Sequence, residues 1–209
     1  MTREDSRDQT TQRLLEAAQK LIAKKGLSAA SVEDIAAAAG YTRGAFYSNF
    51  SSKGDLFIEL LRRDHEKTTA ELNALRTDTL SLDQIQTRAR TIYAQLYHDN
   101  ESFMNWTEAR MLAARDTKFR AKLNALLTEK RGQIAGFIEY FHERAGAPPQ
   151  VSPAAMAMGF MSLAEGVKLS MLSSPTDMTP EAAESVLTLF VDSIMQLARI
   201  QGEERTAKT

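Results

Sequence analysis

Cysteine is absent from this sequence of 209 residues. Its absence excludes disulfide bonds, cysteine-ligated zinc and thiol catalysis, and it fits a reducing compartment. No apolar run approaches the roughly 18 residues that a membrane-spanning helix needs. The N-terminus is polar and mixed in charge, unlike a signal peptide. We therefore expect a soluble, cytoplasmic protein that has no membrane partner.

An excess of basic residues is missing as well, because the formal net charge is −1. Binding to nucleic acid would then have to depend on a local patch and not on the charge of the whole chain. Residues 1–63 carry a net charge of +2, whereas residues 64–209 carry −3. This small asymmetry has the sign expected if the N-terminal part contacts DNA.

Motifs of catalysis and metal binding are scarce. The three histidines, at positions 65, 98 and 142, are too scattered in the sequence to suggest a catalytic triad. Phosphate-binding loops, nucleophile elbows and the His-Glu-x-x-His motif are absent. Glu139 and His142 form one Glu-x-x-His unit, but helical di-iron proteins use that unit in pairs. We predict that the protein is not an enzyme and that it has no metal and no cofactor.

Residues 31–50 are the most informative stretch that is present. Ser31 precedes Asp34 by three residues, a capping-box pattern that opens a helix. Gly40 tolerates the left-handed conformation that ends a helix, and Thr42 is a second N-cap candidate. A helix, a glycine turn and a second helix form a helix-turn-helix, whose second helix enters the major groove of DNA.

The rest of the chain favours an all-α fold. Apolar residues recur at helical spacing, proline or glycine follows several of these stretches, and no convincing strand pattern occurs. We expect a flexible arm over the first dozen residues. Residues 1–52 form an N-terminal three-helix DNA-binding domain, and residues 53–209 form a helical domain for effector binding and dimerisation. About nine helices are predicted, near residues 8–25, 31–40, 42–50, 53–75, 81–97, 101–115, 116–144, 153–172 and 180–198.

The last two predicted helices are too apolar for the surface of a monomer. A short proline-containing loop joins them, which favours an antiparallel hairpin. Two such hairpins related by a two-fold axis would bury the excess apolar surface as a four-helix interface. The residues that we assign to this homodimer interface are Met158, Val167, Leu187, Phe190, Val191 and Ile194.

Residues 13–57 resemble the N-terminal domain of the TetR family of transcriptional repressors. The resemblance covers about a quarter of the chain, and the C-terminal part is similar to the family only in being helical and of suitable length. It implies a homodimer that binds a palindromic operator in double-stranded DNA and is released by a small-molecule effector. The positions that carry it are Gly26, Ser31, Val32, Asp34, Ile35, Ala36, Ala39, Gly40, Gly44, Phe46, Tyr47, Phe50, Lys53, Asp55 and Leu56.

The predicted DNA-binding residues divide into readers and anchors. Arg43 begins the second helix and offers a fork to guanine, while Ala45 can touch a thymine methyl group. Gly44 either lets the backbone approach DNA or is a tolerated defect in a short helix. The resemblance implies phosphate contacts for Tyr47 and Lys53, although a half-buried core role for Tyr47 has equal weight. The complete predicted set is Ser31, Thr42, Arg43, Gly44, Ala45, Tyr47, Ser48, Asn49 and Lys53.

Aromatic and methionine side chains of the C-terminal part are candidates for an apolar, adaptable effector pocket. For any one of them, a role in the hydrophobic core is the more common alternative. Glu165 lies in an almost wholly apolar stretch, so its charge needs a partner, either a cationic group of the effector or an arginine across the dimer. The predicted set is Tyr93, Tyr97, Phe103, Met104, Trp106, Met111, Phe137, Tyr140, Phe141, Met161 and Glu165.

These features together predict a ligand-responsive DNA-binding regulator, a repressor released by a small and largely apolar effector. The alternative is a helical enzyme or ligand-binding protein whose DNA-binding domain is vestigial. Such a protein would show no salt-sensitive binding to DNA.

Overall fold

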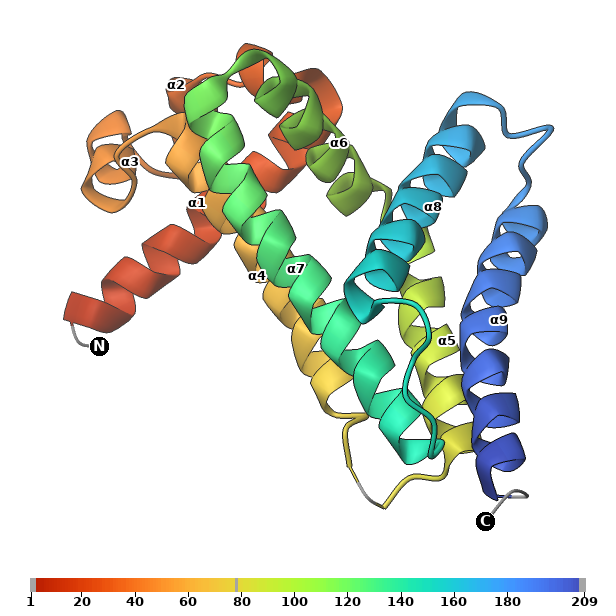
Figure 1. Ribbon diagram of the computed structural model, residues 1–209. Coiled ribbons are helices and arrows are strands. Elements are labelled where there is room, and N and C mark those ends of the chain that lie inside the picture. The colour runs from red at the N-terminus through yellow and green to blue at the C-terminus, as the bar shows by residue number, and fades with distance from the viewer. Residues whose placement is uncertain (1–2, 78, 207–209) are drawn as a thin grey trace. The chain divides into compact units, whose positions relative to one another are not determined.

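The computed structural model describes the backbone of residues 3–77 and 79–206, and the side chains of these residues except 3, 4, 6, 95–98, 204 and 206. Over this range the chain is all α-helical, without a strand, as predicted (Figure 1). The nine helices are α1 (Arg3–Ala29), α2 (Val32–Ala38), α3 (Arg43–Asn49), α4 (Lys53–Asn73), α5 (Leu82–His98), α6 (Asn100–Arg115), α7 (Thr117–Arg144), α8 (Pro153–Ser173) and α9 (Pro180–Thr206).

Short polar side chains fix where the C-terminal helices begin. Ser81 and Gln84 form a reciprocal capping box at α5, with Gln84 N donating to Ser81 Oγ at 3.2 Å. The carboxylate of Asp116 accepts a hydrogen bond from Phe119 N at the start of α7. Proline occupies the first position of both α8 and α9, where the missing N–H costs nothing.

The first helix differs from the expected flexible arm, since the chain is already helical at Arg3. Tertiary contacts explain the difference, because Thr11 Oγ1 donates to Asn49 Oδ1 and Arg63 donates to the side chain of Gln12. Gly26 interrupts α1 with φ 80° and ψ 159°, near the predicted end of the helix. A short turn continues to Ala29, so the helical chain bends here and does not stop.

The chain divides into two units by its internal contacts. Unit 1 contains residues 1–67 and 99–126, and unit 2 contains residues 68–98 and 127–209. Helices α4 and α7 therefore contribute residues to both units. The functional division at residue 52 stays a prediction, and unit 1 includes α6 in addition to the helix-turn-helix.

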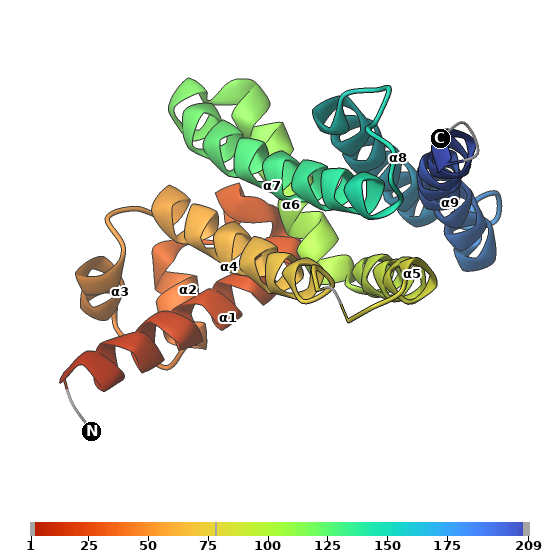
Figure 2. The same cartoon turned by 60° about the horizontal axis from the view of Figure 1, so that its bottom comes forward.

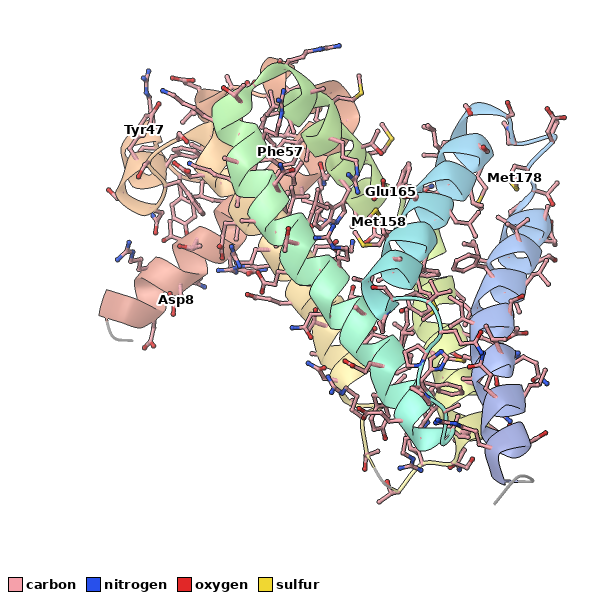
Figure 3. The ribbon with its side chains drawn as sticks, in the orientation of Figure 1. Asp8, Tyr47, Phe57, Met158, Glu165 and Met178 are labelled. Atoms are coloured by element: carbon pink, nitrogen blue, oxygen red, sulfur yellow. The ribbon has the colours of Figure 1, made fainter. Side chains whose placement is uncertain are left out.

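The core of unit 1 is formed by one face of α1 together with the short helices and the start of α4. Leu14, Phe46 and Leu56 are completely buried. Phe57 stacks on Phe119 of α7 with ring centroids 5.8 Å apart, and it lies in the interior among other side chains (Figure 3). Burying two aromatic rings removes a large apolar area from water, which is the main favourable contribution of such a core.

Unit 2 is a helical layer in which α8 and α9 run antiparallel beside each other (Figures 1 and 2). Its core includes Ile85, Tyr93, Phe141, Phe160 and Leu187. The ring of Tyr93 meets the edge of Phe160 at a centroid distance of 4.4 Å. This arrangement confirms the helical nature of the C-terminal part, which the sequence pattern predicted from its apolar periodicity.

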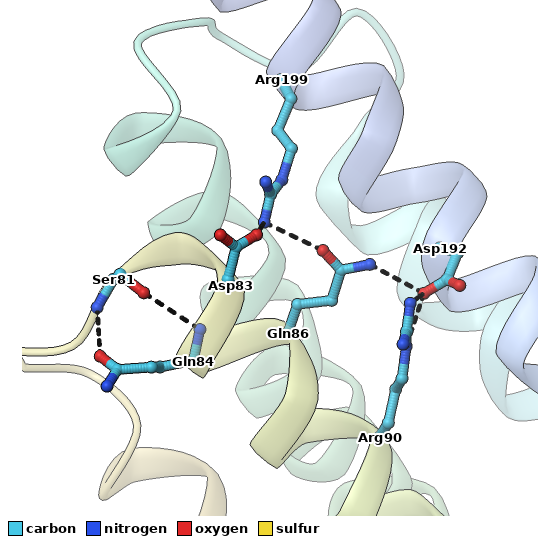
Figure 4. Close-up of polar contacts among 7 residues, drawn as sticks. All are labelled: Ser81, Asp83, Gln84, Gln86, Arg90, Asp192 and Arg199. Carbon is cyan, nitrogen blue, oxygen red and sulfur yellow. Dashed lines mark hydrogen bonds and ion pairs between the residues drawn. The ribbon is translucent and has the colours of Figure 1, made fainter.

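A polar network joins α5 to α9 at the surface of unit 2 (Figure 4). Asp192 accepts hydrogen bonds from Gln86 Nε2 at 2.9 Å and from Arg90 Nε at 2.7 Å. Arg199 donates to Gln86 Oε1 and forms an ion pair with Asp83. Because several donors share one carboxylate, the network holds the register of the two helices more firmly than a single exposed ion pair would.

Helix α8 is long and apolar enough to cross a membrane by length and composition, contrary to the expectation from the sequence. It is the one such helix among the described residues, and 28% of its most apolar window is buried within the protein. Packed helices of soluble proteins meet the same criterion, so this composition by itself assigns no membrane.

Candidate nucleic-acid interface

The turn between α2 and α3 has the backbone geometry that a helix-turn-helix requires. Gly40 has φ 79°, a left-handed conformation that only glycine adopts without strain. Ser31 Oγ accepts from Asp34 N at 3.0 Å, and the carboxylate of Asp34 accepts from Ser31 N at 3.1 Å. Hydrogen bonds from Lys25 and Ser31 lower the pKa of Asp34 to about 2, so this cap stays ionised at neutral pH.

Helix α3 turns one apolar face to the protein and one polar face to solvent. Phe46 and Phe50 are buried against each other and against the rest of unit 1. The exposed side carries Thr42, Arg43, Gly44, Tyr47 and Ser48. Tyr47 is 47% exposed, and its ring meets that of the buried Phe46 at a centroid distance of 5.3 Å, so a phosphate contact and a half-buried packing role both stay open. It extends outward from α3 (Figure 3).

Arg43 is held in place by two neighbours. One guanidinium nitrogen lies 2.7 Å from Glu33 Oε1 of α2, and both side chains are well exposed. The guanidinium carbon is also 5.4 Å from the ring centre of Tyr47. These contacts keep Arg43 on the exposed side of the helix-turn-helix, close to the start of α3.

Glycine at position 44 leaves the first turn of α3 uncovered. A Cβ built there would meet only Thr42 Oγ1, at 3.6 Å, an ordinary van der Waals distance. The free protein therefore gives no steric reason for a glycine in this helix. The observation favours the functional interpretation, in which the DNA backbone approaches this turn closely.

Asn49 has a structural role that the sequence did not reveal. Its Nδ2 donates to Ala45 O at 2.8 Å, and its Oδ1 accepts from Thr11 Oγ1 of α1 at 3.0 Å. Ser48, by contrast, uses its hydroxyl only within α3, on Gly44 O. Asn49 therefore fixes α3 to α1, and a base contact would require it to give up these bonds.

Lys53 does not offer a free ammonium group, in contrast to the predicted phosphate contact. Its Nζ donates to the carbonyl oxygens of Leu27 and Ala30 at the end of α1. Burial lowers the pKa of Lys53, and the charge of Lys25 adds to this effect. The lysine therefore satisfies orphan carbonyls at the end of a helix, where a cation is favoured.

Four of the predicted effector residues belong to unit 1, all on α6. Met104 and Met111 are exposed and Phe103 is half-buried. Trp106 is buried, and its indole Nε1 donates to Asp64 Oδ2 at 2.6 Å. Trp106 thus connects α6 to α4 through Asp64, and its assignment to an effector pocket stays a prediction.

The remaining predicted effector residues belong to unit 2. Tyr93, Phe137 and Phe141 are buried in its core cluster, and Met161 packs against that cluster. Burial raises the pKa of the Tyr93 phenol. Tyr140 is tied by its hydroxyl to Thr77 O at 2.9 Å. Glu165 is half-buried on α8 (Figure 3), and the side chain of Tyr97 lies outside the described residues.

The predicted dimer residues also differ in exposure. Val167, Leu187 and Val191 are buried in the core of unit 2, and Phe190 stacks on Phe160 within the same chain. These positions face inward because they complete the core of the hairpin itself. The large apolar side chains that α8 and α9 leave exposed are Met158, Leu169, Leu172, Leu189, Leu197 and Ile200.

Several polar residues at key positions have partners that the sequence pattern does not predict. Glu33 pairs with Arg43, and Glu108 Oε1 accepts from Leu27 N at 2.9 Å beside the bend at Gly26. Asn105 and Lys168 are 2% exposed, although both side chains are polar. Lys168, like Glu165, is a charged residue in the otherwise apolar α8, so the sequence indicates that it needs a partner. No local pattern identifies the partners of Glu33 and Glu108.

Comparison with known proteins shows what the N-terminal part of the chain is similar to. Residues 14–60 match the sequence profile of a family described as bacterial regulatory proteins, tetR family. Over 52 residues the chain is 46% identical to the HTH-type transcriptional regulator AcrR of Shigella flexneri. This match covers 25% of the chain and 24% of AcrR, so the chain matches about a quarter of that relative's length.

Solved structures resemble the chain over most of its length. A transcriptional regulator from Rhodococcus sp. Rha1 has a TM-score of 0.70 and 22% identity, covering 90% of this chain and 97% of that one. The complex of SmeT with triclosan has a TM-score of 0.68 and 20% identity, covering 88% and 90%. SmeT is described as the repressor of a multidrug efflux pump of Stenotrophomonas maltophilia. At these identities the likeness establishes the shared fold and no more.

Proposed function

Since the chain belongs to the tetR family of bacterial regulatory proteins, we propose that it is a cytoplasmic repressor that binds a palindromic operator as a homodimer. Transcription regulation through a DNA-binding helix-turn-helix is the activity of its relatives, which are regulators and not enzymes. A small, largely apolar effector releases the protein from DNA. It does so because it binds more tightly to the conformation that cannot bind the operator than to the conformation that can.

The exposed face of α3 is the single observation that carries this proposal. Arg43 stands at the first position of that helix, and Gly44 leaves its first turn open. A guanidinium fork there matches the O6 and N7 acceptors of guanine, and Ala45 suits a thymine methyl group. The helix N-termini at Ser31 and Thr42 offer backbone amides to phosphates, and the Tyr47 hydroxyl is free to reach another.

The homodimer interface follows from the apolar side chains that α8 and α9 leave exposed. At 100° per residue, Met158, Leu169 and Leu172 lie within about 60° of one another on α8. Leu189 and Ile200 lie within about 20° on α9. A two-fold axis would bring both stripes together as a four-helix interface, with Leu189, 69% exposed, near its middle.

The effector site is proposed within unit 2, beside the aromatic cluster of Tyr93, Phe137 and Phe141. Aromatic and methionine side chains adapt to apolar ligands, and Glu165 adds one charge for orientation. The SmeT–triclosan complex supports an apolar ligand for a protein of this fold. The proposed binding to DNA does not depend on which molecule is the effector.

Selection from a random duplex library tests this function directly. The full-length protein should enrich an inverted repeat whose half-sites are centred about one or more helical turns apart. Affinity for that repeat should fall steeply with salt. A vestigial domain would enrich no sequence and show no salt-sensitive binding, and that result would refute the proposal.

A further inference from the structure

Two phenylalanines anchor the short helix α3 in the core of unit 1. Phe46 is completely buried and Phe50 is 8% exposed, and their ring centroids lie 5.8 Å apart. Apolar contacts are not directional, so they fix how deeply a helix is buried more firmly than its rotation about its own axis. A hydrogen bond at the edge of the buried face would fix that rotation.

Thr11 of α1 makes such a hydrogen bond. Its Oγ1 donates to Asn49 Oδ1 at 3.0 Å, and Asn49 Nδ2 donates to Ala45 O at 2.8 Å. At 100° per residue, Asn49 lies about 60° from Phe46 and about 120° from Arg43 around the axis of α3. Asn49 is therefore at the edge of the buried face, where a bond to α1 opposes rotation of the helix.

The turn of α1 that carries Thr11 is itself held in place. Arg63 of α4 donates to the side chain of the next residue, Gln12. Leu14 and Leu15, which follow in the next turn, are buried in the core of unit 1. The Thr11 hydroxyl therefore belongs to a part of α1 that is fixed from two sides.

The amide of Asn49 is engaged at both its oxygen and its nitrogen. An asparagine that reads adenine uses both of these groups, on N6 and N7 of the base. Here the oxygen accepts from Thr11 and the nitrogen donates to Ala45. This arrangement favours a role of Asn49 in orienting α3 over a direct contact with a base.

We propose that Thr11 is a positioning residue for sequence reading, which it supports through Asn49 without touching DNA. This inference rests on the proposed function. Arg43 begins α3 and Asn49 ends it, so they lie about 9 Å apart along the axis, and a rotation at one end moves the guanidinium at the other. Groups that recognise a ligand must be held within about 0.5 Å and 10–20° of their productive geometry. Loss of the Thr11 hydroxyl should therefore weaken base reading and spare the phosphate contacts.

Variants of the hydroxyl test this role on two duplexes, the operator that the parent protein selects and a scrambled sequence. Thr11→Val removes the hydroxyl and keeps the branched shape and the helix propensity. By fluorescence anisotropy it should bind the operator about three- to tenfold more weakly, with affinity for the scrambled duplex unchanged. Thr11→Ser keeps the hydroxyl and should restore operator binding. A residue that serves stability alone would lower the urea midpoint and leave the ratio of the two affinities unchanged.

A double-mutant cycle with Asn49→Ala tests whether Thr11 acts through Asn49. If it does, adding Thr11→Val to Asn49→Ala should change operator affinity less than twofold. Equal losses on both duplexes, an unchanged ratio of affinities, or a full further loss in the Asn49→Ala background would overturn the inference alone. A parent protein that selects no operator would refute the proposed function, and the inference with it.

Discussion

At the scale of single residues, Arg43 has a partner, Glu33, that it would have to give up to contact a base as proposed. Its guanidinium is paired with Glu33 at 2.7 Å and lies against Tyr47. An exposed pair of this kind contributes only about 0–1 kcal/mol, whereas a bidentate contact with guanine discriminates by about 1–3 kcal/mol. The proposed base contact is therefore worth more free energy than the pair with Glu33. Losing that pair reduces the net free energy gained on binding, and the Glu33 carboxylate also places a negative charge near the phosphates.

Substitutions at these two positions should have opposite effects on DNA binding. Glu33→Gln should raise operator affinity severalfold, because about 1 kcal/mol corresponds to roughly a fivefold change. Arg43→Ala should relax sequence preference, with a loss on the operator of about 1–3 kcal/mol and a small loss on scrambled duplexes. Fluorescence anisotropy on both duplexes measures this, and equal losses for Arg43→Ala would contradict base reading.

Lys53 is expected to matter for stability more than for phosphate contact. Lys53→Met keeps much of the aliphatic stem and leaves the carbonyls of Leu27 and Ala30 without their charged donor. We expect a loss of about 1–2 kcal/mol in the free energy of unfolding, at the lower end because the group is partly exposed. The salt dependence of DNA affinity should change little. If the slope of log affinity against log salt concentration instead fell by about one unit while stability stayed unchanged, the result would support a phosphate contact by Lys53.

His142 should give unit 2 a pH-dependent stability. The side chain is 1% exposed, and burial lowers its pKa below the usual 6.5. Between the lowered pKa and 6.5 the unfolded chain binds a proton that the folded chain does not, so stability is lost as the pH falls below 6.5. Relative to His142→Leu, the parent should become less stable between pH 7.5 and 5.5 in urea titrations. A difference that does not vary with pH would disprove this linkage.

At the scale of helices, Gly202 allows α9 to approach the end of α7. A Cβ at this position would lie 1.9 Å from the carbonyl oxygen of Ala145, which belongs to the backbone and cannot rotate away. At Gly166 of α8, a Cβ would meet nothing within 4 Å. The two glycines lie in helices of the same unit, yet only one of them is required by close packing.

Alanine substitutions at these glycines form a matched pair. Gly202→Ala should destabilise the protein by about 1–3 kcal/mol or more through overpacking. Gly166→Ala should be neutral or stabilise it by up to about 1 kcal/mol through helix propensity. Thermal unfolding followed by circular dichroism measures both. Equal stability of the two variants would argue against the close contact of α9 with Ala145.

Helix ends were predictable from the sequence, whereas long-range partners were not. Ser31, Thr42, Ser81 and Asp116 each act on backbone groups three residues away, so the local pattern contains the whole interaction. The first dozen residues were expected to form a flexible arm. Their local pattern does not show that Thr11 and Gln12 contact Asn49 and Arg63. The predicted DNA-reading face of α3 is exposed, while Trp106 and Lys53 have partners that no local spacing encodes.

At the scale of the whole molecule, the proposed dimer rests on the apolar side chains that α8 and α9 leave exposed. Leu189→Glu combined with Met158→Glu should separate the subunits, because both side chains are exposed and a buried carboxylate without a partner is costly. Val167→Ala is the contrasting variant. It should lower the stability of the core of unit 2 and leave the mass of the dimer unchanged.

Light scattering at micromolar concentration should give a dimeric mass for the parent protein and a monomeric mass for the double variant. Operator affinity should fall together with the mass, because one half-site alone provides about half of the contacts. A monomeric parent protein would contradict the proposed homodimer. A double variant that remains dimeric would show that the interface lies elsewhere.

The contacts of α6 with α1 limit how the DNA-binding part can be exchanged between proteins. Glu108 and Asn105 bind backbone groups of Leu27 and Gln19, and these partners lie more than eighty positions apart in the chain. A chimera that joins residues 1–52 to the C-terminal part of another regulator would lose both bonds. Grafting a new reading head onto this protein would therefore require α6 to be transferred with it, or its counterpart to be matched to α1.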